Sequence, residues 1–281
     1  MATCTARFFA LWLAFAMPAA GACPLVLGIF PRWTATETFT RFQPLARALA
    51  ANVGCEVKLE TTKDFAGFGR AVADGRYDIV HYNPIQHWQA HRRFGYRAIL
   101  MNEEDGERFL TGVVAVRKDS PVQHLAELRG KTIVFGGDRD AMVAYVAPTA
   151  LLRAAGLKAG DYREQFAHNP SQAILGLQHG RGDAATTASL IFGLPSAVSR
   201  LNPRAVRVIA QSAPLPQHAW AVKRGMPAPL ASRVQIFLAA LNTTASGRAV
   251  LAQAKLTRLW PASDTDYRKA LAASKLAEGK L

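Results

Sequence analysis

Cysteine is scarce in this sequence, with three residues in 281. Beyond its first residues the chain also lacks any segment apolar enough to cross a bilayer, so we expect a soluble mature protein. It contains no low-complexity stretch and no long linker. These absences leave an ordinary globular chain, long enough for two domains with cores of their own.

The common motifs of catalysis and metal binding are also missing. There is no Gly-x-Ser-x-Gly elbow, no His-Glu-x-x-His and no acidic calcium-type loop, and Gly136-Gly137 lacks the rest of a dinucleotide or phosphate loop. His87 and His91 are four residues apart and could share a metal ion, but a third ligand is missing and two arginines follow. We therefore predict a non-enzyme without metal or cofactor; the alternative is a secreted enzyme with scattered catalytic residues.

The first 22 residues have the pattern of a secretory signal peptide. Arg7 precedes the apolar residues 8–17, and the small residues 20–22 form a cleavage site. The apolar run is short for a transmembrane anchor, which is the competing interpretation. We expect cleavage near Ala22 and a periplasmic location.

Positive charge dominates the chain, which carries a formal net charge of +14. Such an excess can attract nucleic acid, anionic membranes or small anions. Export argues against nucleic acid, and the basic residues are scattered along the chain. The charge therefore indicates a general attraction for anions and no more, and we expect no nucleic-acid partner.

Cys23 and Cys55 remain after Cys4 is lost with the signal peptide. Each precedes a predicted strand, and the amino ends of neighbouring parallel strands lie side by side. In an oxidising compartment this favours a disulfide between them. The competing interpretation is lipidation of Cys23, although residues 20–22 lack the usual leucine of a lipobox.

Twice a short strand leads into Asn-Pro and a helix, at Asn83-Pro84 and Asn169-Pro170. Asparagine suits the N-cap and proline the first helical position. Each stretch therefore places a helix N-terminus, with its partial positive charge, at the carboxyl end of a strand. Ligands of open α/β sheets bind at that edge, so the pair suggests two lobes facing one cleft.

Strands and helices alternate along most of the chain, which predicts parallel sheets built from βαβ units. A capping box at residues 34–37 opens the first helix. Residues 109–117 form a longer strand that breaks the rhythm, and residues 219–222 form a second extended segment. We therefore predict an α/β protein with lobe one in residues 23–112 and 216–281, lobe two in residues 113–215, and two crossovers at a hinge.

Several motifs resemble the periplasmic solute-binding proteins of ABC transporters, specifically the phosphate, phosphite and phosphonate type. They include Gly28-Ile-Phe-Pro31, Gly75-x-Tyr-Asp78-Ile, Val116-Arg-Lys-Asp-Ser120, Ala147-Pro-Thr-x-Leu-Leu152 and Gly182-Asp-Ala184. The resemblance implies a class II binding-protein fold: two mostly parallel sheets flanked by helices, with the ligand at the hinge. It also implies a permease in the inner membrane as the partner.

The resemblance places ligand groups at residues 32–36, 82–87 and 137–142. The third of these turns carries Asp138-Arg139-Asp140 where the family is rich in serine and threonine. Two carboxylates there would compete with a phosphonate or bind an amino group on the ligand. With the second Asn-Pro turn included, the predicted cleft residues are Thr34, Thr36, Tyr82, Asn83, His87, Asp138, Arg139, Asp140 and Asn169.

We therefore predict a monomeric binding protein that captures a small oxyanion by hinge closure and delivers it to an ABC importer. The alternative is a sensory or accessory module for another solute, which would use the same fold.

Overall fold

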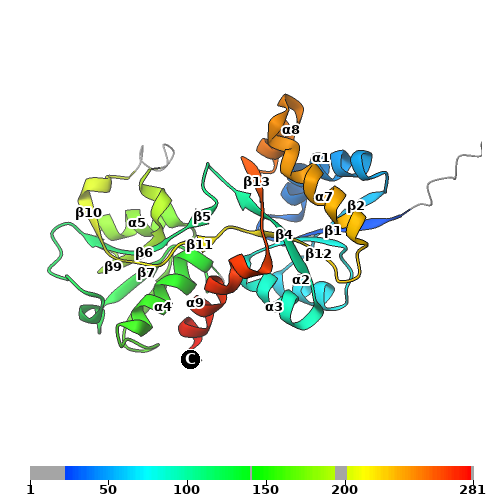
Figure 1. Cartoon of the computed structure of the whole chain (residues 1–281). Helices are drawn as coiled ribbons and strands as arrows, with labels where there is room; N and C mark the ends of the chain where they lie inside the picture. The colour runs from blue at the N-terminus through cyan, green and yellow to red at the C-terminus, as the bar shows by residue number, and fades with distance from the viewer. Residues whose placement is uncertain (1–22, 140, 194–200, 280–281) are drawn as a thin grey trace, which may run out of the picture.

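In the computed structural model, which describes residues 23–139, 141–193 and 201–279, the chain forms two lobes, each built around its own sheet. Figure 1 shows the lobes side by side, with the longest connections running between them. The predicted signal peptide and Asp140 lie outside the described residues. None of the helices in these ranges has the length and apolar run needed to span a membrane.

Lobe one contains a six-stranded sheet in the order β13-β4-β12-β3-β1-β2. The first four strands in sequence run in one direction, and β12 and β13 are antiparallel to their neighbours. The extended segment expected at residues 219–222 is β12, which lies between β3 and β4 in this sheet. The strands are β1 Leu25–Ile29, β2 Val57–Glu60, β3 Ile79–Tyr82, β4 Arg97–Glu103, β12 Ala219–Val222 and β13 Arg258–Pro261.

Helices cover both faces of this sheet. One face packs against α1 (Ala35–Val53), α7 (Ala228–Ala240) and α8 (Ala245–Gln253), and the other against α2 (Phe65–Ala73) and α3 (Pro84–Phe94). The predicted capping box is present: Thr34 Oγ1 accepts from Glu37 N, and the Glu37 carboxylate accepts from Thr34 N. Local sequence thus sets where α1 begins.

Lobe two contains a five-stranded sheet in the order β10-β6-β9-β7-β8. Its helices α4 (Ala147–Ala154) and α5 (Pro170–Gln178) pack on opposite faces, and the π-helix η2 (Met142–Val146) leads directly into α4. The described part of the lobe also contains three short 3-10 helices, η1 (Leu125–Leu128), η3 (Ser189–Phe192) and η4 (Pro203–Ala205). The strands are β6 Gly112–Arg117, β7 Thr132–Phe135, β8 Arg163–Phe166, β9 Ala184–Ala188 and β10 Val206–Gln211.

Two extended crossovers connect the lobes and pair with each other. The strand expected over residues 109–117 is two strands, β5 (Phe109–Leu110) and β6, because the chain leaves one pairing at Thr111 and enters the second sheet. β5 pairs antiparallel with β11 (Leu215–Pro216) of the return crossover. The resulting two-stranded ribbon lies where a hinge is expected.

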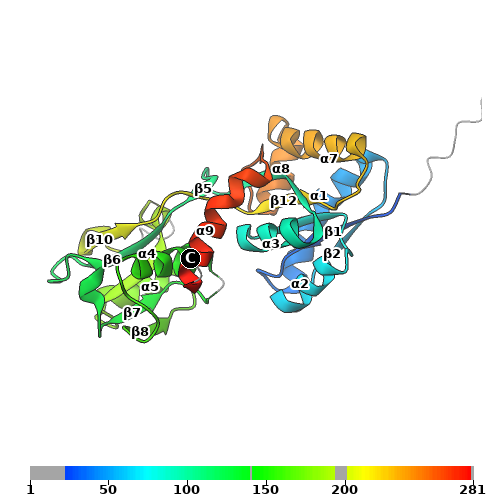
Figure 2. The ribbon, with the colours of Figure 1, turned by 60° about the horizontal axis from the view of Figure 1, so that its bottom comes forward.

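The C-terminal helix makes a third link between the lobes. Asp264 in the 3-10 helix η6 (Asp264–Tyr267) accepts hydrogen bonds from lobe one, and the following helix α9 (Arg268–Glu278) packs against α4 of lobe two. Figure 2 shows α9 lying between the lobes, with its C-terminal end beside α4. Assigning residues 216–281 to lobe one therefore stays a prediction, since α9 contacts both lobes.

The predicted disulfide between Cys23 and Cys55 is confirmed, with the two Cα atoms 5.0 Å apart. It joins the start of β1 to the start of β2, which are parallel neighbours. The bridge closes a loop with a sequence separation of 32 residues. A loop of this length stabilises the fold by about 3–4 kcal/mol in the chain-entropy description.

Candidate functional site

A cavity of about 630 Å³ lies between the two lobes. Lobe one contributes the turn after β1 and the start of α3, and lobe two contributes the turn after β7, the start of η2 and the start of α5. The two crossovers form the rest of the wall. The lining residues are Phe30, Pro31, Arg32, Phe65, Asn83, Pro84, Glu104, Leu110, Gly136, Asp138, Ala141, Met142, Val143, Ala144, Pro170, Pro216, Gln217 and His218.

Three helix N-termini reach this cavity, through Pro84 of α3, Met142 of η2 and Pro170 of α5. The first-turn amides of a helix have no partner within the helix, and the helix dipole adds partial positive charge there. Asn83 and Asn169 each cap their helix by accepting from a third-position amide. The cavity wall therefore offers main-chain donors suited to an oxyanion.

Arg32 and Glu104 form a forked ion pair in the cavity wall. Arg32 Nη1 lies 2.8 Å from Glu104 Oε1, and Nη2 lies 3.2 Å from Oε2. His218 Nδ1 lies 3.1 Å from Glu104 Oε1. Among the lining residues that the structure describes, Arg32 is the only arginine or lysine. Arg32 and Glu104 are thus paired in the cavity wall, and Asp138 is the other carboxylate among the described lining residues.

Buried polar side chains hold Glu104 from behind. Trp220 Nε1 donates to Asn102 Oδ1 at 2.7 Å, and Asn102 Nδ2 donates to Glu104 Oε1 at 2.9 Å. Asn102 Nδ2 also lies 3.0 Å from His81 Nε2. Asn102 and Trp220 are fully buried, and the asparagine amide has partners on both its oxygen and its nitrogen. The carboxylate of Glu104 is therefore held in place by a packed core.

The pKa values in this network favour an ionised Glu104 and neutral histidines. Burial alone would raise the pKa of Glu104, but hydrogen bonds from His218 and Arg32 and the positive charge of Arg32 hold it well below its usual range. Burial and the charge on Arg32 lower the pKa of His218, against a partial upward effect of Glu104. Burial lowers the pKa of His81 far more. At neutral pH the described charges of the network are those of Arg32 and Glu104.

A family model described as the periplasmic substrate-binding protein of an ABC phosphonate transporter matches residues 27–267. The chain belongs to this family. Proteins of the family are periplasmic, bind small molecules and work with an ABC transporter permease. The match covers both lobes and both crossovers.

Solved structures share this fold over nearly the whole chain. A Xanthomonas citri protein bound to ATP matches with a TM-score of 0.75 and 18% identity, over 92% of this chain and 98% of that chain. A Prochlorococcus marinus PhnD1 protein in complex with methylphosphonate matches with a TM-score of 0.68 and 14% identity, over 92% and 99%. The binding component of a Pseudomonas aeruginosa ABC phosphonate transporter gives 0.65 and 16%, over 92% and 89%.

Two of the predicted ligand residues of this family member line the cavity. Asn83 lies at the start of α3, and Asp138 lies in the turn after β7. Asn169 caps α5 one residue before Pro170, which lines the cavity, so its role is to fix the helix start. Local sequence locates the turns at Asn83 and Asn169 because both residues are helix caps, whereas the family resemblance indicates the turn at Asp138.

Tyr82 and His87 lie behind the cavity, in the core between the sheet and α3. Both are fully buried, and Tyr82 Oη lies 3.1 Å from His87 Nδ1. His87 Nε2 is 2.9 Å from Asp264 Oδ1, so this imidazole joins α3 to η6. Burial lowers the pKa of His87 despite the hydrogen bond to Asp264. Neither side chain is among the lining residues of the cavity.

The remaining predicted residues lie away from the cavity wall. Thr34 uses its hydroxyl in the α1 capping box, and Thr36 is exposed on the first turn of that helix. Arg139 Nη1 donates to Tyr145 Oη at 2.9 Å, and the same guanidinium pairs with Glu164 on β8. Asp140 lies outside the described residues.

The residues of the cavity wall that the motifs did not single out come mainly from the crossovers. Glu104 directly follows β4, and Gln217 and His218 directly precede β12. Glu104 and His218 are 114 positions apart, so no local pattern joins them. Arg32 lies within the first turn that the family resemblance indicated, and its pairing with Glu104 appears only in three dimensions.

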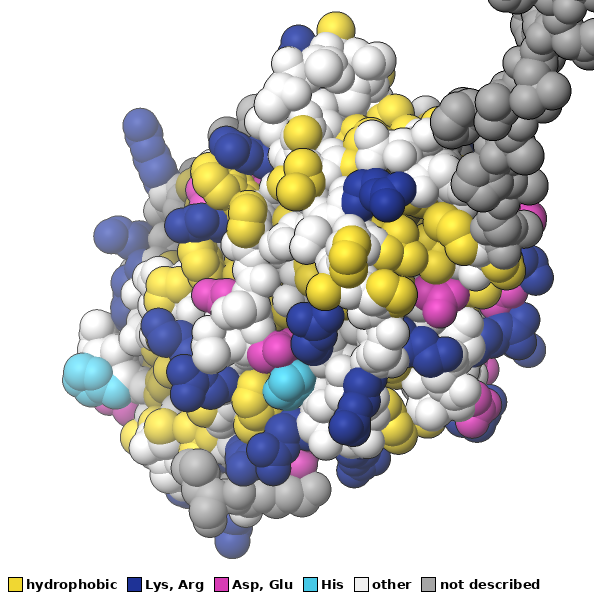
Figure 3. All heavy atoms as spheres, turned by 45° about the vertical axis from the view of Figure 1, so that its right-hand side comes forward, with side chains coloured by type: hydrophobic (Ala, Val, Ile, Leu, Met, Phe, Trp, Pro, Cys, Tyr) yellow, Lys and Arg dark blue, Asp and Glu magenta, His cyan; other side chains and the backbone are white. Residues whose placement is uncertain are grey.

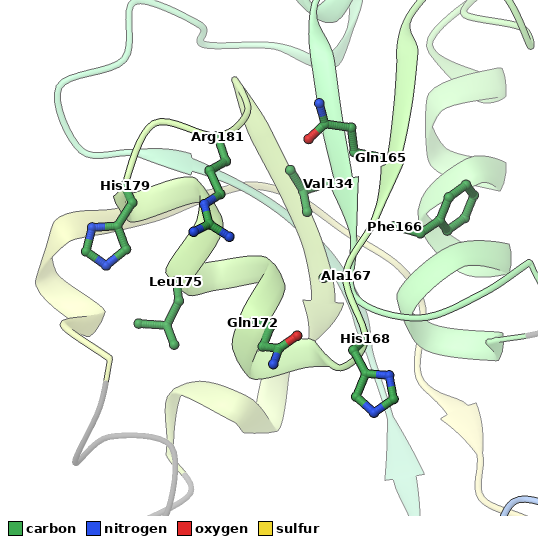
Figure 4. A pocket seen from close by; sticks show the side chains of 10 residues that line it. Val134, Gln165, Phe166, Ala167, His168, Gln172, Leu175, His179 and Arg181 are labelled. Atoms are coloured by element: carbon green, nitrogen blue, oxygen red, sulfur yellow. The ribbon is translucent and has the colours of Figure 1, made fainter.

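A second cavity of about 440 Å³ lies on lobe two, between β8 and α5. Figure 4 shows Arg181 and Gln172 pointing into it, with His179 at the end of α5 and His168 at the end of the strand. The side chains that form its rim are exposed.

Lysine and arginine side chains are spread over the face of the molecule shown in Figure 3 and form no single stripe.

Proposed function

We propose that this chain captures a small oxyanion of the phosphate, phosphite or phosphonate class in the cleft between its lobes. The observation that carries the proposal is the convergence of three helix N-termini and the Arg32 guanidinium on one cavity. Main-chain donors and a forked arginine both match the geometry of a tetrahedral oxyanion. The volume of about 630 Å³ is in the range of small-molecule sites.

Capture would proceed by closure of the lobes around the paired crossovers. The ligand bridges donors of lobe one and lobe two, so it binds the closed arrangement better and shifts the population toward it. The crossover pairs Leu110–Leu215 and Phe109–Pro216 supply the ribbon about which the lobes rotate. We expect the protein to act as an exported monomer that releases the ligand unchanged to its permease.

The proposal is tested with a thermal-shift panel of phosphate, phosphite, methylphosphonate and sulfate, followed by calorimetry on every ligand that shifts the transition. Because a bound ligand stabilises the folded state by mass action, at least one phosphorus oxyanion should raise the melting temperature in proportion to its concentration. ATP belongs in the panel, because a structural neighbour was solved with it. A panel in which no phosphorus compound binds would refute the proposal.

A further inference from the structure

Four arginine side chains gather at one end of lobe one, where α3 ends and β4 begins. Arg92 and Arg93 lie in the last turn of α3, and Arg97 is the first residue of β4. Arg224 follows β12 and joins them, because a Cβ atom added at Gly95, the C-cap of α3, would lie 2.8 Å from Arg224 Cδ. All four arginines are exposed. They form the α3 arginine patch.

The charges of the α3 arginine patch are not neutralised by neighbouring carboxylates. None of its guanidinium groups forms an ion pair with a carboxylate of residues 23–139, 141–193 and 201–279. Two aspartates at this end of the lobe are partly buried and accept main-chain hydrogen bonds instead: Asp78 from Val26 N at 2.8 Å, and Asp264 from Ala98 N at 2.9 Å. The patch therefore presents a local excess of positive charge to solvent.

Helix capping explains only half of this patch. Basic residues in the last turn of a helix interact favourably with the helix dipole, which accounts for Arg92 and Arg93. Arg97 and Arg224 lie outside the helix, in a strand and after a strand, so the dipole of α3 gives no reason for their charge. A partner that carries negative charge does.

An exposed aromatic side chain belongs to the same surface. Phe94 follows Arg93 at the end of α3 and is 37% exposed. Arginines bind phosphate groups with a forked geometry, and an apolar ring beside them can enter the headgroup region of a bilayer. None of the four arginines lines the cleft or the cavity on lobe two, so the patch does not suit an enclosed small ligand. Its composition fits a membrane surface.

The patch lies at the edge of the lobe-one sheet opposite the cleft. Strand β4 starts at Arg97 in the patch and runs toward Glu104 in the cleft wall. The parallel strands β1, β2 and β3 run in the same direction, so they also start at the patch edge. A contact at the patch therefore leaves the mouth of the cleft uncovered.

We propose that the α3 arginine patch and Phe94 form a docking surface for anionic phospholipid headgroups. Proteins of the family work with an ABC transporter permease, so this chain acts beside a bilayer. Reversible attachment through the patch holds the protein at that bilayer while the cleft stays open to its ligand. The inference goes beyond the proposed function and does not depend on which ligand the cleft binds.

Sedimentation of the full mature chain with vesicles measures this interaction. Vesicles of phosphatidylcholine with about one-third phosphatidylglycerol should bind the protein at low salt at least about 20-fold more tightly than pure phosphatidylcholine, since each basic residue near an anionic surface adds about fivefold. Raising the salt concentration to about 0.3 M should remove most of this difference, because screening shortens the reach of the charges.

Replacing the whole patch by glutamine assigns the binding to it. The quadruple variant should bind the anionic vesicles at least about 20-fold more weakly than the wild type. The corresponding lysine variant keeps the charge and should stay within about threefold, so it separates the loss of charge from any change in structure. The four glutamine substitutions are Arg92→Gln, Arg93→Gln, Arg97→Gln and Arg224→Gln.

The matched control removes the same charge from four exposed arginines that lie on α1, β8, the end of α5 and η4. It should stay within about threefold of the wild type, because these charges are far apart and largely screened from the contact. Its substitutions are Arg47→Gln, Arg163→Gln, Arg181→Gln and Arg204→Gln.

Phe94 is tested against another exposed phenylalanine. Phe94→Ala should weaken vesicle binding by about threefold, because the apolar contribution to interfacial binding scales with the buried area. Phe39→Ala is its control, since Phe39 is 41% exposed on α1, outside the patch, and its loss should have no effect.

Equal binding of the two vesicle types at low salt overturns the inference. So do equal losses in the patch variant and the charge-matched control, which would assign the binding to net charge. A patch variant that loses binding to polyglutamate but keeps its binding to anionic vesicles would assign the patch to an acidic protein partner, and would also overturn it. Each of these results leaves the proposed function intact, because the cleft is tested with soluble ligands.

Discussion

The two walls of the cleft are built in different ways. The wall from lobe one and the crossovers carries side-chain charge: Arg32, Glu104 and His218 contact each other, and buried Asn102 orients the carboxylate. The wall from lobe two contains Gly136, Pro170 and residues 141–144 at the start of a helix, with Asp138 as its charged side chain. Under the proposed function, the lobe-one wall supplies the paired charges of Arg32 and Glu104, and the lobe-two wall supplies main-chain amide donors beside Asp138.

The largest effect should come from removing the single cation of the lobe-one wall. Arg32→Ala deletes the guanidinium that the proposal places on the oxyanion and removes the ion pair of Glu104 beside it. We expect phosphonate affinity to fall by at least about 100-fold, or about 3 kcal/mol, in calorimetric titrations.

Arg181→Ala is the matched control, since this arginine lies in the other cavity and no ion pair is recorded for it within the described chain. It removes the same net charge and should leave affinity within about twofold, because exposed distant charges are screened. Equal losses in the two variants would show that the effect is general electrostatics and would remove Arg32 from the site.

The lobe-two wall is tested by filling the space at Gly136. A Cβ atom there would lie 2.7 Å from Thr186 O and 3.0 Å from Pro170 Cα, at the start of α5. Gly136→Ala should therefore lower the free energy of unfolding by about 2 kcal/mol, and should also weaken ligand binding because α5 shifts. Urea denaturation and calorimetry measure the two effects.

Gly69→Ala is its control, because no atom lies within 4 Å of the added Cβ and the position is helical. It should raise the free energy of unfolding by about 0.5–1 kcal/mol, the usual gain for alanine over glycine in a helix. A Gly136→Ala protein as stable as the wild type would show that the packing of Thr186 and Pro170 against position 136 does not require glycine.

The third link between the lobes is tested at Asp264. This carboxylate accepts from His87 Nε2 and from Ala98 N, both at 2.9 Å, and so ties the segment before α9 to lobe one. Asp264→Ala should lower the free energy of unfolding by about 1–2 kcal/mol, because Nε2 of the buried His87 loses its hydrogen-bond partner.

Asp119→Ala is a suitable control, because that carboxylate is 84% exposed and its ion pair with Arg117 lies at the surface. Exposed pairs of this kind contribute little to stability. If the two variants unfold at the same denaturant concentration, α9 is not held to lobe one through Asp264.

The last predicted effect is a loss of stability in mild acid that originates in lobe one. The pKa values of His81, His87 and His218 are lowered on folding. As the pH falls below about 6.5, these histidines therefore bind protons in the unfolded chain but stay neutral in the folded chain. Each such proton gives a slope of up to about 1.4 kcal/mol per pH unit, with stability decreasing toward acid.

The pKa values of Glu104 and Asp264 are also lowered on folding. These carboxylates add to the loss of stability only when the pH falls below the pKa values that they have in the unfolded chain. Urea melts at pH 7.5, 6.5 and 5.5 measure the slope. His218→Gln should reduce it, and a stability that does not change between pH 7.5 and 5.5 would contradict the assignment of neutral buried histidines.

Much of the fold could be predicted from sequence because its signals are local. The capping box at Thr34, the Asn83-Pro84 start of α3 and the Asn169-Pro170 start of α5 each depend on neighbouring residues, and all three appear in the structure. Hydrophobic periodicity likewise indicated most strands. The break at Thr111 was missed, because a strand that changes sheets keeps its apolar pattern.

The site was harder to predict because its contacts are not local. Tyr82 and His87 attract attention as polar groups at a helix start, yet the strand and helix turn them toward the core behind the cavity. Glu104, Gln217 and His218 lie in crossovers whose sequence shows no motif, and only the fold brings them together. Cap chemistry locates the edge of the cleft, and long-range pairing decides which side chains face it.

Closure of the lobes on a bound oxyanion is tested most directly by measuring the distance between them. Spin labels on cysteines introduced at exposed Lys63 in lobe one and Lys158 in lobe two report that distance by pulsed electron resonance. Cys23 and Cys55, the cysteines of the described residues, are paired and do not take up label. Saturating the protein with the tightest-binding phosphonate should shift the distance distribution to a single closed population, and Arg32→Ala should prevent the shift. A distribution that stays the same while calorimetry shows full occupancy would contradict the account.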